Sequence, residues 1–368
     1  MGLTELHVSP LGLPPGSKHQ WTFKPNEPGG HVDLARCDLY TQLYDTSWCD
    51  RRRTLTLLGP FAYKHWDNRS LDVSLVANES SYDTRLLSAY RARRGRVRLP
   101  DRPNDLRVSF QALDLFDQPL AFNTTLPPVK TVITTLQKDN PVIWITDWVR
   151  YYQSIGVDRV MIYDNGSSNI DAVRSALSAV SGDIVLIHWP FPYGDPKHSN
   201  SFMAQVGALR HATELNHDSG WLLNFDIDEY LVPKHGLTKL LNKRLLIGRL
   251  QIPSFRAITS IPEETEIRAG NQIWREKTVG PAAKYIMRLK GDPKPRVHTA
   301  VLGFPYRAKT LAITDAYYLH YRGLTTHWKE TSKWHSSGQQ IDAGTHVQDT
   351  SVAGQFAALE ENDQSRSL

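Results

Sequence analysis

The sequence has little cysteine and no long apolar run. Cys37 and Cys49 are the only cysteines among 368 residues, too few for a disulfide framework or a zinc site built from cysteine. A single Cys37–Cys49 disulfide is left open. No stretch of 18 consecutive apolar residues occurs, so a transmembrane span is not expected. The N-terminus lacks a basic region followed by an apolar segment, so we expect no signal peptide and a cytoplasmic location.

The motifs of several enzyme classes are missing as well. No Gly-x-x-x-x-Gly-Lys-Ser/Thr loop is present, which disfavours a P-loop NTPase. No Gly-x-Gly-x-x-Gly follows the first strand predicted for the α/β region, which disfavours a dinucleotide-dependent oxidoreductase. The Gly-x-Ser-x-Gly elbow of serine hydrolases is also absent.

The charge is only modestly positive. The net charge is +5, and no tract of Lys and Arg interleaved with aromatics occurs, so nucleic acid is not an expected partner. Such an excess suits a partner that carries phosphates, or peripheral contact with an anionic membrane. The strongest basic patch is the run 90–98. It predicts either a solvated strand edge that its charge protects from aggregation, or contact with an anionic acceptor or membrane.

Two different patterns divide the chain. Residues 1–30 are rich in Pro and Gly and predict an irregular arm. Between about 53 and 113, apolar and polar residues alternate with a period of two, as in 71–78 and 106–112, which predicts a half-solvated antiparallel β module. We therefore expect a β-rich N-terminal module over 1–125, a catalytic domain over 126–325 and a helical or irregular extension over 326–368.

The central region alternates strands and helices. Strands are predicted over 129–136, 159–163, 184–188 and 221–225. Helices are predicted from Pro141 to about 155, over 171–179 and over 201–215, because apolar residues recur there at helical spacing. This alternation implies parallel strands and right-handed crossovers, and hence a three-layer α/β fold.

Polar residues follow the carboxyl ends of these strands. They form the segments 138–140, 164–169 and 226–229, and the last of these places Asp226 and Asp228 directly after a buried apolar run. In an α/β sheet the carboxyl ends of parallel strands meet at one edge, where ligands bind. We expect the three segments to line one crevice. Carboxylates there suit a divalent metal that bridges the two phosphates of a sugar donor.

Blocks of the sequence resemble glycosyltransferase family 92 and the related family 2 group. The blocks are Asp147 to Tyr152, Gly156-Val157, Val160 to Ser167, and Trp221 with Asp226-Ile227-Asp228-Glu229-Tyr230; with His320-Tyr321 they cover about 130–322. The resemblance implies a GT-A fold (Rossmann-like, with a mainly parallel sheet), a nucleotide-sugar donor, most simply a UDP-sugar, Mn²⁺ or Mg²⁺, and transfer with inversion to a glycan or small-molecule hydroxyl.

The resemblance also implies roles for particular residues. Asp164 would contact the nucleotide base or ribose, Asp226 the ribose or metal, and Asp228 the metal. His320 would be a C-terminal ligand of the metal or pyrophosphate, with weaker support for Lys284 and His298. The donor nucleotide is thus expected to contact Lys138, Asp139, Asp164, Asn165, Ser167, Asp226 and Lys284. The expected metal ligands are Asp226, Asp228, His320 and His298.

Three points stay open in the sequence. The catalytic base is expected among Glu264, Glu263 and Asp292, because carboxylates follow the Asp-x-Asp strand there. The aromatic residues of 189–193 predict either a platform for an acceptor sugar or a packed loop. The alternative functions are a nucleotidyltransferase and a non-catalytic carbohydrate-binding or partner-binding protein with the same fold. Asp147, Tyr152 and Asn169 replace the family's usual Glu, His and Asp.

Overall fold

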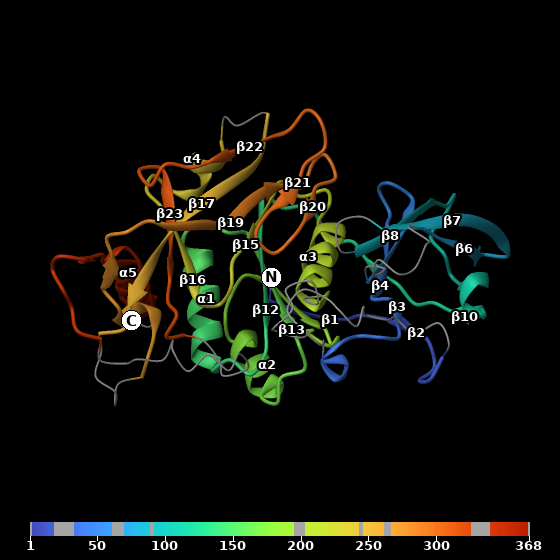
Figure 1. Cartoon of the computed structure of the whole chain (residues 1–368), viewed down its shortest axis with the longest axis horizontal. Helices are drawn as coiled ribbons and strands as arrows, with labels where there is room; N and C mark the ends of the chain where they lie inside the picture. Colours follow the sequence, from blue (N-terminus) through green and yellow to red (C-terminus); the bar gives the residue numbers. More distant parts are fainter. Residues whose placement is uncertain are drawn as a thin grey trace.

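A computed structural model describes residues 2–17, 33–60, 70–88, 92–194, 203–242, 246–260, 266–324 and 339–366. It contains a 12-stranded sheet and an 8-stranded sheet, together with two small two-stranded ones. Figure 1 shows the 8-stranded sheet and the C-terminal helix at opposite ends of the molecule. None of the helices in these ranges combines the length and apolarity needed to cross a membrane.

The large sheet begins with five strands that pair in parallel. Their order across the sheet is β1 (Leu3–His7), β14 (Asp183–His188), β13 (Arg159–Asp164), β12 (Thr131–Gln137) and β15 (Trp221–Asn224). Strands β12 and β13 are rich in β-branched and other apolar residues and are buried almost throughout. Such continuous apolar runs are expected where helices cover both faces of a parallel sheet.

Helices cover this part of the sheet on both faces. Helices α1 (Val142–Ser154) and α2 (Ile170–Ser178) pack with one set of strand side chains, and α3 (Met203–Leu215) packs with the other. Helix α1 starts after Pro141 and ends before Gly156, whose positive φ of 98° favours glycine. The expected three-layer α/β fold is therefore confirmed.

Beyond β15 the sheet continues with strands from the C-terminal half of the chain, most of which pair antiparallel. Strand β19 (Gly280–Arg288) pairs with β15 and with β17 (Ile247–Ile258). Strand β16 (Glu229–Pro233) pairs with β23 (Ala316–His320), and β23 also pairs in parallel with β17. Further elements of this half include β18 (Trp274–Glu276), β20 (Lys294–Pro295), β21 (Ala300–Val301), β22 (Arg307–Thr310), β24 (His346–Gln348) and the short helix α4 (Leu237–Leu241).

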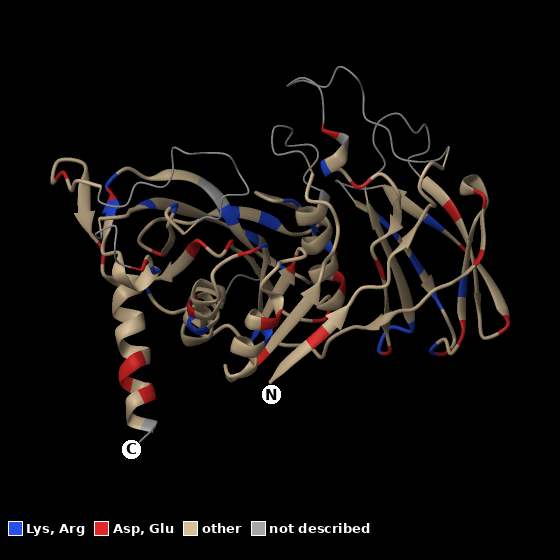
Figure 2. Ribbon diagram, turned by 90° about the horizontal axis from the view of Figure 1, so that it is seen from below, with Lys and Arg blue, Asp and Glu red and all other residues tan. Residues whose placement is uncertain are grey.

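The 8-stranded sheet forms the β module that the sequence predicts. Its strand order is β10 (Leu115–Pro119), β9 (Leu106–Phe110), β6 (Ser70–Ala77), β7 (Ser80–Ser88), β8 (Ala92–Arg98), β5 (Thr54–Pro60), β4 (Asp45–Cys49) and β11 (Asn123–Thr124). In β6 alternate residues are buried, beginning with Leu71, because one face packs on the module's own core. Figure 2 shows basic residues along several strands of this module.

The N-terminal arm differs from the prediction in part. Residues 3–7 form β1, which pairs in parallel with β14 at the edge of the large sheet. Leu3 and Leu6 pack against the two apolar clusters on the opposite faces of that sheet. Partial burial of these two side chains and pairing with the β14 edge explain why this short segment is ordered. Strands β2 (Leu11–Gly12) and β3 (Thr41–Leu43) form a separate pair.

The C-terminal extension is helical at its end. Helix α5 (Ser351–Arg366) buries Val352 and Phe356 in the same cluster as α1. Strand β24 pairs with β18, so the extension is tied to the large sheet as well. Cys37 and Cys49 are free thiols, which decides against the disulfide.

Candidate active site

The expected edge of the sheet carries the predicted polar segments. Gln137 at the end of β12 lies level with Asp164 at the end of β13, and Thr134 lies level with Asn224 at the end of β15. The segments 138–140, 164–169 and 226–229 therefore follow neighbouring parallel strands. Their convergence follows from the parallel pairing and could be predicted from the alternation of strands and helices.

Asp164 is held by hydrogen bonds within its own loop. One carboxylate oxygen accepts the backbone N–H groups of Gly166 and Ser167, each at 3.1 Å. The other accepts the amide of Gln137. The Asp164 side chain is buried, so it is turned toward the protein in this structure. Gly166, with φ of 75°, takes the left-handed conformation that the turn requires.

Two predicted donor-binding residues join this loop to the neighbouring one. Ser167 Oγ accepts the N–H of Asp139 at 2.9 Å and an amide N–H of Gln137 at 3.0 Å. Asp139 accepts the N–H of Ser168 at 2.7 Å. Lys138 is exposed beside them. These bonds make the segments 137–140 and 164–168 one rigid unit.

Asn165 binds the backbone of the aromatic segment that follows β14. Its amide donates to the carbonyls of Trp189 and Phe191, at 2.8 and 2.7 Å. Both aromatic side chains are buried and pack against Tyr44 of the N-terminal segment. These two rings are therefore packed in a loop and do not form an exposed platform. Tyr193 of the same stretch is half-buried, and its hydroxyl donates to Gln205 at 3.1 Å.

Asp226 lies in a turn beyond β15 and faces a buried lysine. Lys284 Nζ, from β19, is 2.6 Å from Asp226 Oδ2 and 3.0 Å from Glu229 Oε2. The backbone N–H of Asp226 also donates to Glu229 Oε2 at 2.9 Å. Gln205 of α3 donates weakly to Asp226 Oδ1, at 3.4 Å. This contact brings together Asp226 and Lys284, both of which the sequence interpretation assigned to the donor site.

Glu229 is a site residue to which the sequence interpretation gave no role. Its side chain is 3% exposed, and that of Lys284 is 2% exposed. Burial raises the pKa of Glu229, Lys284 opposes this effect, and the nearby Asp226 and Asp228 raise the pKa further. Burial would lower the pKa of Lys284, but the two acids outweigh it and raise that pKa. The pairing of a buried Glu with a buried Lys has no signal in the sequence, because the two residues lie on different strands.

Asp228 and His320 meet across the β16–β23 pair. Asp228 Oδ2 and His320 Nε2 are 3.1 Å apart although 92 positions separate them in the chain. Glu229 lies opposite His320 in the strand register. Burial would lower the pKa of His320, but the charge of Asp228 and its hydrogen bond raise it. Ligand atoms of Asp228, Glu229 and His320 all lie within 4.8 Å of one another.

The other candidate residues make different contacts or lie outside the described ranges. His298 is exposed, and its carbonyl accepts the Gln251 amide at 3.2 Å. Asp292 binds Arg94 and Arg96 of the β module, at 2.5 and 3.1 Å. Partial burial would raise the pKa of Asp292, but the two arginines lower it to about 2. Glu263 and Glu264 lie outside the described residues.

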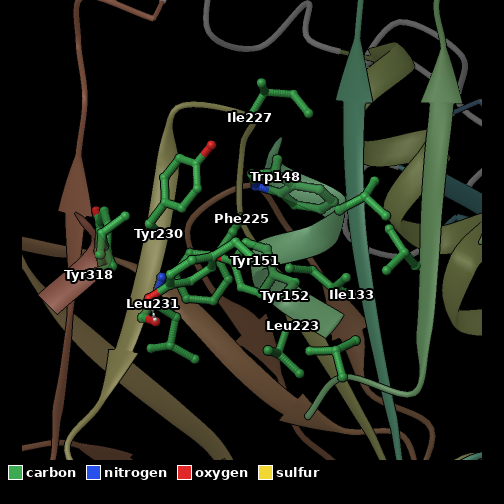
Figure 3. Packing of buried hydrophobic residues seen from close by; sticks show 14 of the residues in the cluster. Ile133, Trp148, Tyr151, Tyr152, Leu223, Phe225, Ile227, Tyr230, Leu231 and Tyr318 are labelled. Atoms are coloured by element: carbon green, nitrogen blue, oxygen red, sulfur yellow. Dashed lines mark hydrogen bonds between the residues drawn. The ribbon is translucent and has the colours of Figure 1, made fainter. Parts of the chain in front are cut away.

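A cluster of buried aromatic residues packs beneath the turn 226–229 (Figure 3). Trp148 Nε1 donates to the carbonyl of Asp226 at 2.9 Å. Tyr152 Oη donates to the carbonyl of Glu229 at 2.8 Å and accepts the N–H of Leu231 at 3.1 Å. Helix α1 therefore fixes the backbone on both sides of Asp228. Tyr152, which departs from the family pattern, makes two of these three hydrogen bonds.

The second departure from the family pattern, Asp147, forms a partly buried ion pair. Asp147, also on α1, binds the Arg268 guanidinium through both carboxylate oxygens, at 2.6 and 2.8 Å. The third departure, Asn169, donates to the carbonyl of Asn140 at 2.9 Å. All three departures therefore have structural partners near the site.

Comparisons with known proteins identify a family for this region. The sequence model of glycosyltransferase family 92 matches residues 137–351, which is more than half of the chain. No curated protein matches the chain. The matched segment contains the two polar loops, the acidic turn, Lys284 and His320.

Similar solved structures are distant. HddC from Yersinia pseudotuberculosis is 14% identical, with a TM-score of 0.31, over 52% of this chain and 92% of its own. The 4-diphosphocytidyl-2C-methyl-D-erythritol synthase from Anaerococcus prevotii is 8% identical, with a TM-score of 0.29, over 44% of this chain and 70% of its own. A glycosyltransferase involved in glycosylation of the major capsid of PBCV-1 is 11% identical, with a TM-score of 0.25, over 53% of this chain and 92% of its own.

Proposed function

The chain belongs to glycosyltransferase family 92, and from that premise we propose a metal-dependent transfer of a sugar from a nucleoside diphosphate donor, a UDP-sugar first, to a hydroxyl of a glycan or small molecule. The transfer inverts the anomeric centre. Family membership favours this reaction over nucleotidyl transfer and over a purely binding role. The observation that carries the proposal is the meeting of Asp228, Glu229 and His320 at the edge where the parallel strands end.

The donor atoms of this cluster fit Mn²⁺ or Mg²⁺. Two carboxylates and one imidazole are offered by the side chains of Asp228, Glu229 and His320, within 4.8 Å of one another. Carboxylate oxygens suit both ions, and an imidazole favours Mn²⁺ of the two. When bound, the ion would neutralise the charge that develops on the leaving diphosphate. Asp226 is the third acid nearby, and it is already paired with Lys284.

In this proposal Lys284 stabilises the acidic turn and does not bind the metal. Three carboxylates lie within one turn of the chain, and their mutual repulsion opposes the packing of that turn. The buried ammonium of Lys284 offsets the charge of Asp226 and Glu229 at 2.6 and 3.0 Å. This contact keeps the acids together before a donor arrives. A residue of this kind positions the ligands and does not react itself.

The catalytic base of an inverting transfer must reach the acceptor hydroxyl. Glu264 and Glu263 remain our candidates, and they precede Glu266 in the stretch that follows β17. Asp292 is the weakest of the three, because a carboxylate with a pKa of about 2 takes up a proton poorly at neutral pH. The rigid unit formed by 137–140 and 164–168 is proposed to contact the nucleotide through Lys138, whose side chain is exposed.

The first experiment measures thermal unfolding with UDP, GDP and CDP, each with and without Mn²⁺. A diphosphate at about 100 times its dissociation constant stabilises the folded state by about 2.7 kcal/mol. We expect a rise in Tm with UDP and Mn²⁺ together, followed by hydrolysis of one UDP-sugar in a screen. The same rise without metal would contradict metal dependence, and no rise with any nucleotide would contradict the proposed donor class.

A further inference from the structure

A second cluster of ligating side chains lies between the β module and the α/β domain, away from the candidate active site. Cys49 ends β4 of the β module, and His217 and Asp218 follow the end of α3. One ligand atom from each of the three lies within 4.8 Å of the others. Cys49 is buried, with 4% of its surface exposed. The cluster therefore joins two parts of the chain more than 160 positions apart.

The imidazole of His217 is oriented as a ligand would be. Its Nδ1 lies 2.9 Å from the carbonyl oxygen of Glu214, and a carbonyl requires Nδ1 to be the protonated nitrogen. The lone pair of the neutral ring is then on Nε2. Nε2 is buried and has no hydrogen-bond partner within the described part of the chain. Metal-binding histidines commonly donate their other N–H to a backbone carbonyl in this way.

Asp218 can offer one oxygen while it keeps its arginine partners. Oδ1 accepts Arg51 Nη2 at 3.1 Å and Arg52 Nη2 at 2.6 Å. Oδ2 lies 3.7 Å from His217 Nε2 and 3.0 Å from Arg51 Nε. The Arg51 side chain is 73% exposed, so this one contact is held weakly and is easily given up. Ligand atoms on tetrahedral zinc lie about 3.3 to 3.8 Å apart, so only a small convergence is needed.

We propose that Cys49, His217 and Asp218 bind one Zn²⁺ ion that ties the β module to the end of helix α3. A thiolate and an imidazole select a softer ion than the oxygen-rich cluster at Asp228 does, so the two sites differ in metal preference. Water supplies the fourth ligand. Binding releases the thiol proton of Cys49 to solvent, because the thiolate is the coordinating form.

Cadmium titration of the full-length, chelator-treated protein tests the proposal. Cd²⁺ replaces zinc at thiolate sites and adds a charge-transfer absorption in the ultraviolet that oxygen and nitrogen ligands do not produce. We expect one equivalent of Cd²⁺ to produce this band in the wild type, and excess Zn²⁺ to abolish it. Cys49→Ser should lose the band. Cys37→Ser, which removes the other buried thiol, should keep it, and so should Asp228→Asn at the candidate active site.

A second variant keeps the test decisive if Cys49→Ser fails to fold. His217→Gln retains both thiols and removes one ligand, and we expect at least a 10-fold weaker affinity for Cd²⁺, measured by the same band. Absence of the band in the wild type would overturn the proposal. Retention of the wild-type affinity in His217→Gln, or loss of the band in Cys37→Ser, would overturn it as well.

Discussion

Two groups of acids at the same edge of the large sheet are held in different ways. In the first, Asp164 and Asp139 accept backbone N–H groups and neutral side chains, so their loops are bonded to each other. In the second, Asp226, Asp228 and Glu229 face the cationic or ionisable groups of Lys284 and His320. Acids of the first group fix the backbone conformation of the loop 164–168. Acids of the second group carry the negative charge that the proposed metal ion would neutralise.

The largest expected effect comes from removing the positive charge of the second group. Lys284→Met should destabilise the protein by about 3 to 5 kcal/mol, because the buried Glu229 then faces the half-exposed Asp226 without a cation. Urea unfolding measures the change. Adding Glu229→Gln to this variant should recover part of the loss. A double variant no more stable than Lys284→Met alone would show that the charge pair is not the cause.

Asp228→Asn should affect turnover more than folding. The amide is a poor ligand in place of the carboxylate that lies 3.1 Å from His320. A loss of several kcal/mol of electrostatic stabilisation corresponds to roughly 10²- to 10³-fold in turnover. Sugar release from the donor measures this change, with Tm as the control for folding. Undiminished turnover in a folded variant would remove Asp228 from the metal site.

Asp164→Asn should affect stability more than nucleotide binding. The asparagine amide can accept on only one side, so either Gln137 or the N–H groups of Gly166 and Ser167 lose their acceptor. A lost buried hydrogen bond costs about 1 to 3 kcal/mol. We expect lower stability in urea and a change in nucleotide affinity smaller than that of Asp228→Asn. Loss of nucleotide binding with unchanged stability would instead assign Asp164 to the donor.

A glycine pair isolates the backbone conformation of the first group. Gly166→Ala should cost about 1 kcal/mol, because φ is 75° while a Cβ atom would meet nothing within 4 Å. Gly354→Ala in helix α5 also meets nothing, and it should stabilise the protein by about 0.5 to 1 kcal/mol because its backbone is helical. Equal signs for the two variants in thermal unfolding would contradict this account.

The smallest effect concerns Asp292 and depends on pH. Its pKa is lowered from 3.8 to about 2 by Arg94 and Arg96, so its contribution to stability is present above about pH 4 and is lost as the pH falls toward 2. The stability difference between wild type and Asp292→Asn should shrink over that range. Turnover at pH 7 should stay within a few-fold of wild type. A loss of 10²-fold or more would restore Asp292 as the base.

The order of the elements, and the edge at which the polar segments meet, follow from local patterns in the sequence. Apolar runs such as that of β12 and the helical spacing in α1 are local patterns, and parallel pairing then places the segments after Gln137, Asp164 and Asn224 together. The resemblance placed Asp228 and His320 in one site, and the structure brings them to 3.1 Å.

Which charged side chains face each other depends on the tertiary fold. The contact of Lys284 with Glu229, the pairing of Asp292 with Arg94, and the meeting of Cys49 with His217 each join segments far apart in the chain. The pairing of β1 with β14 is of the same kind. A single sequence shows periodicity along one element, but partners across elements depend on register, strand order and packing, which no local pattern contains.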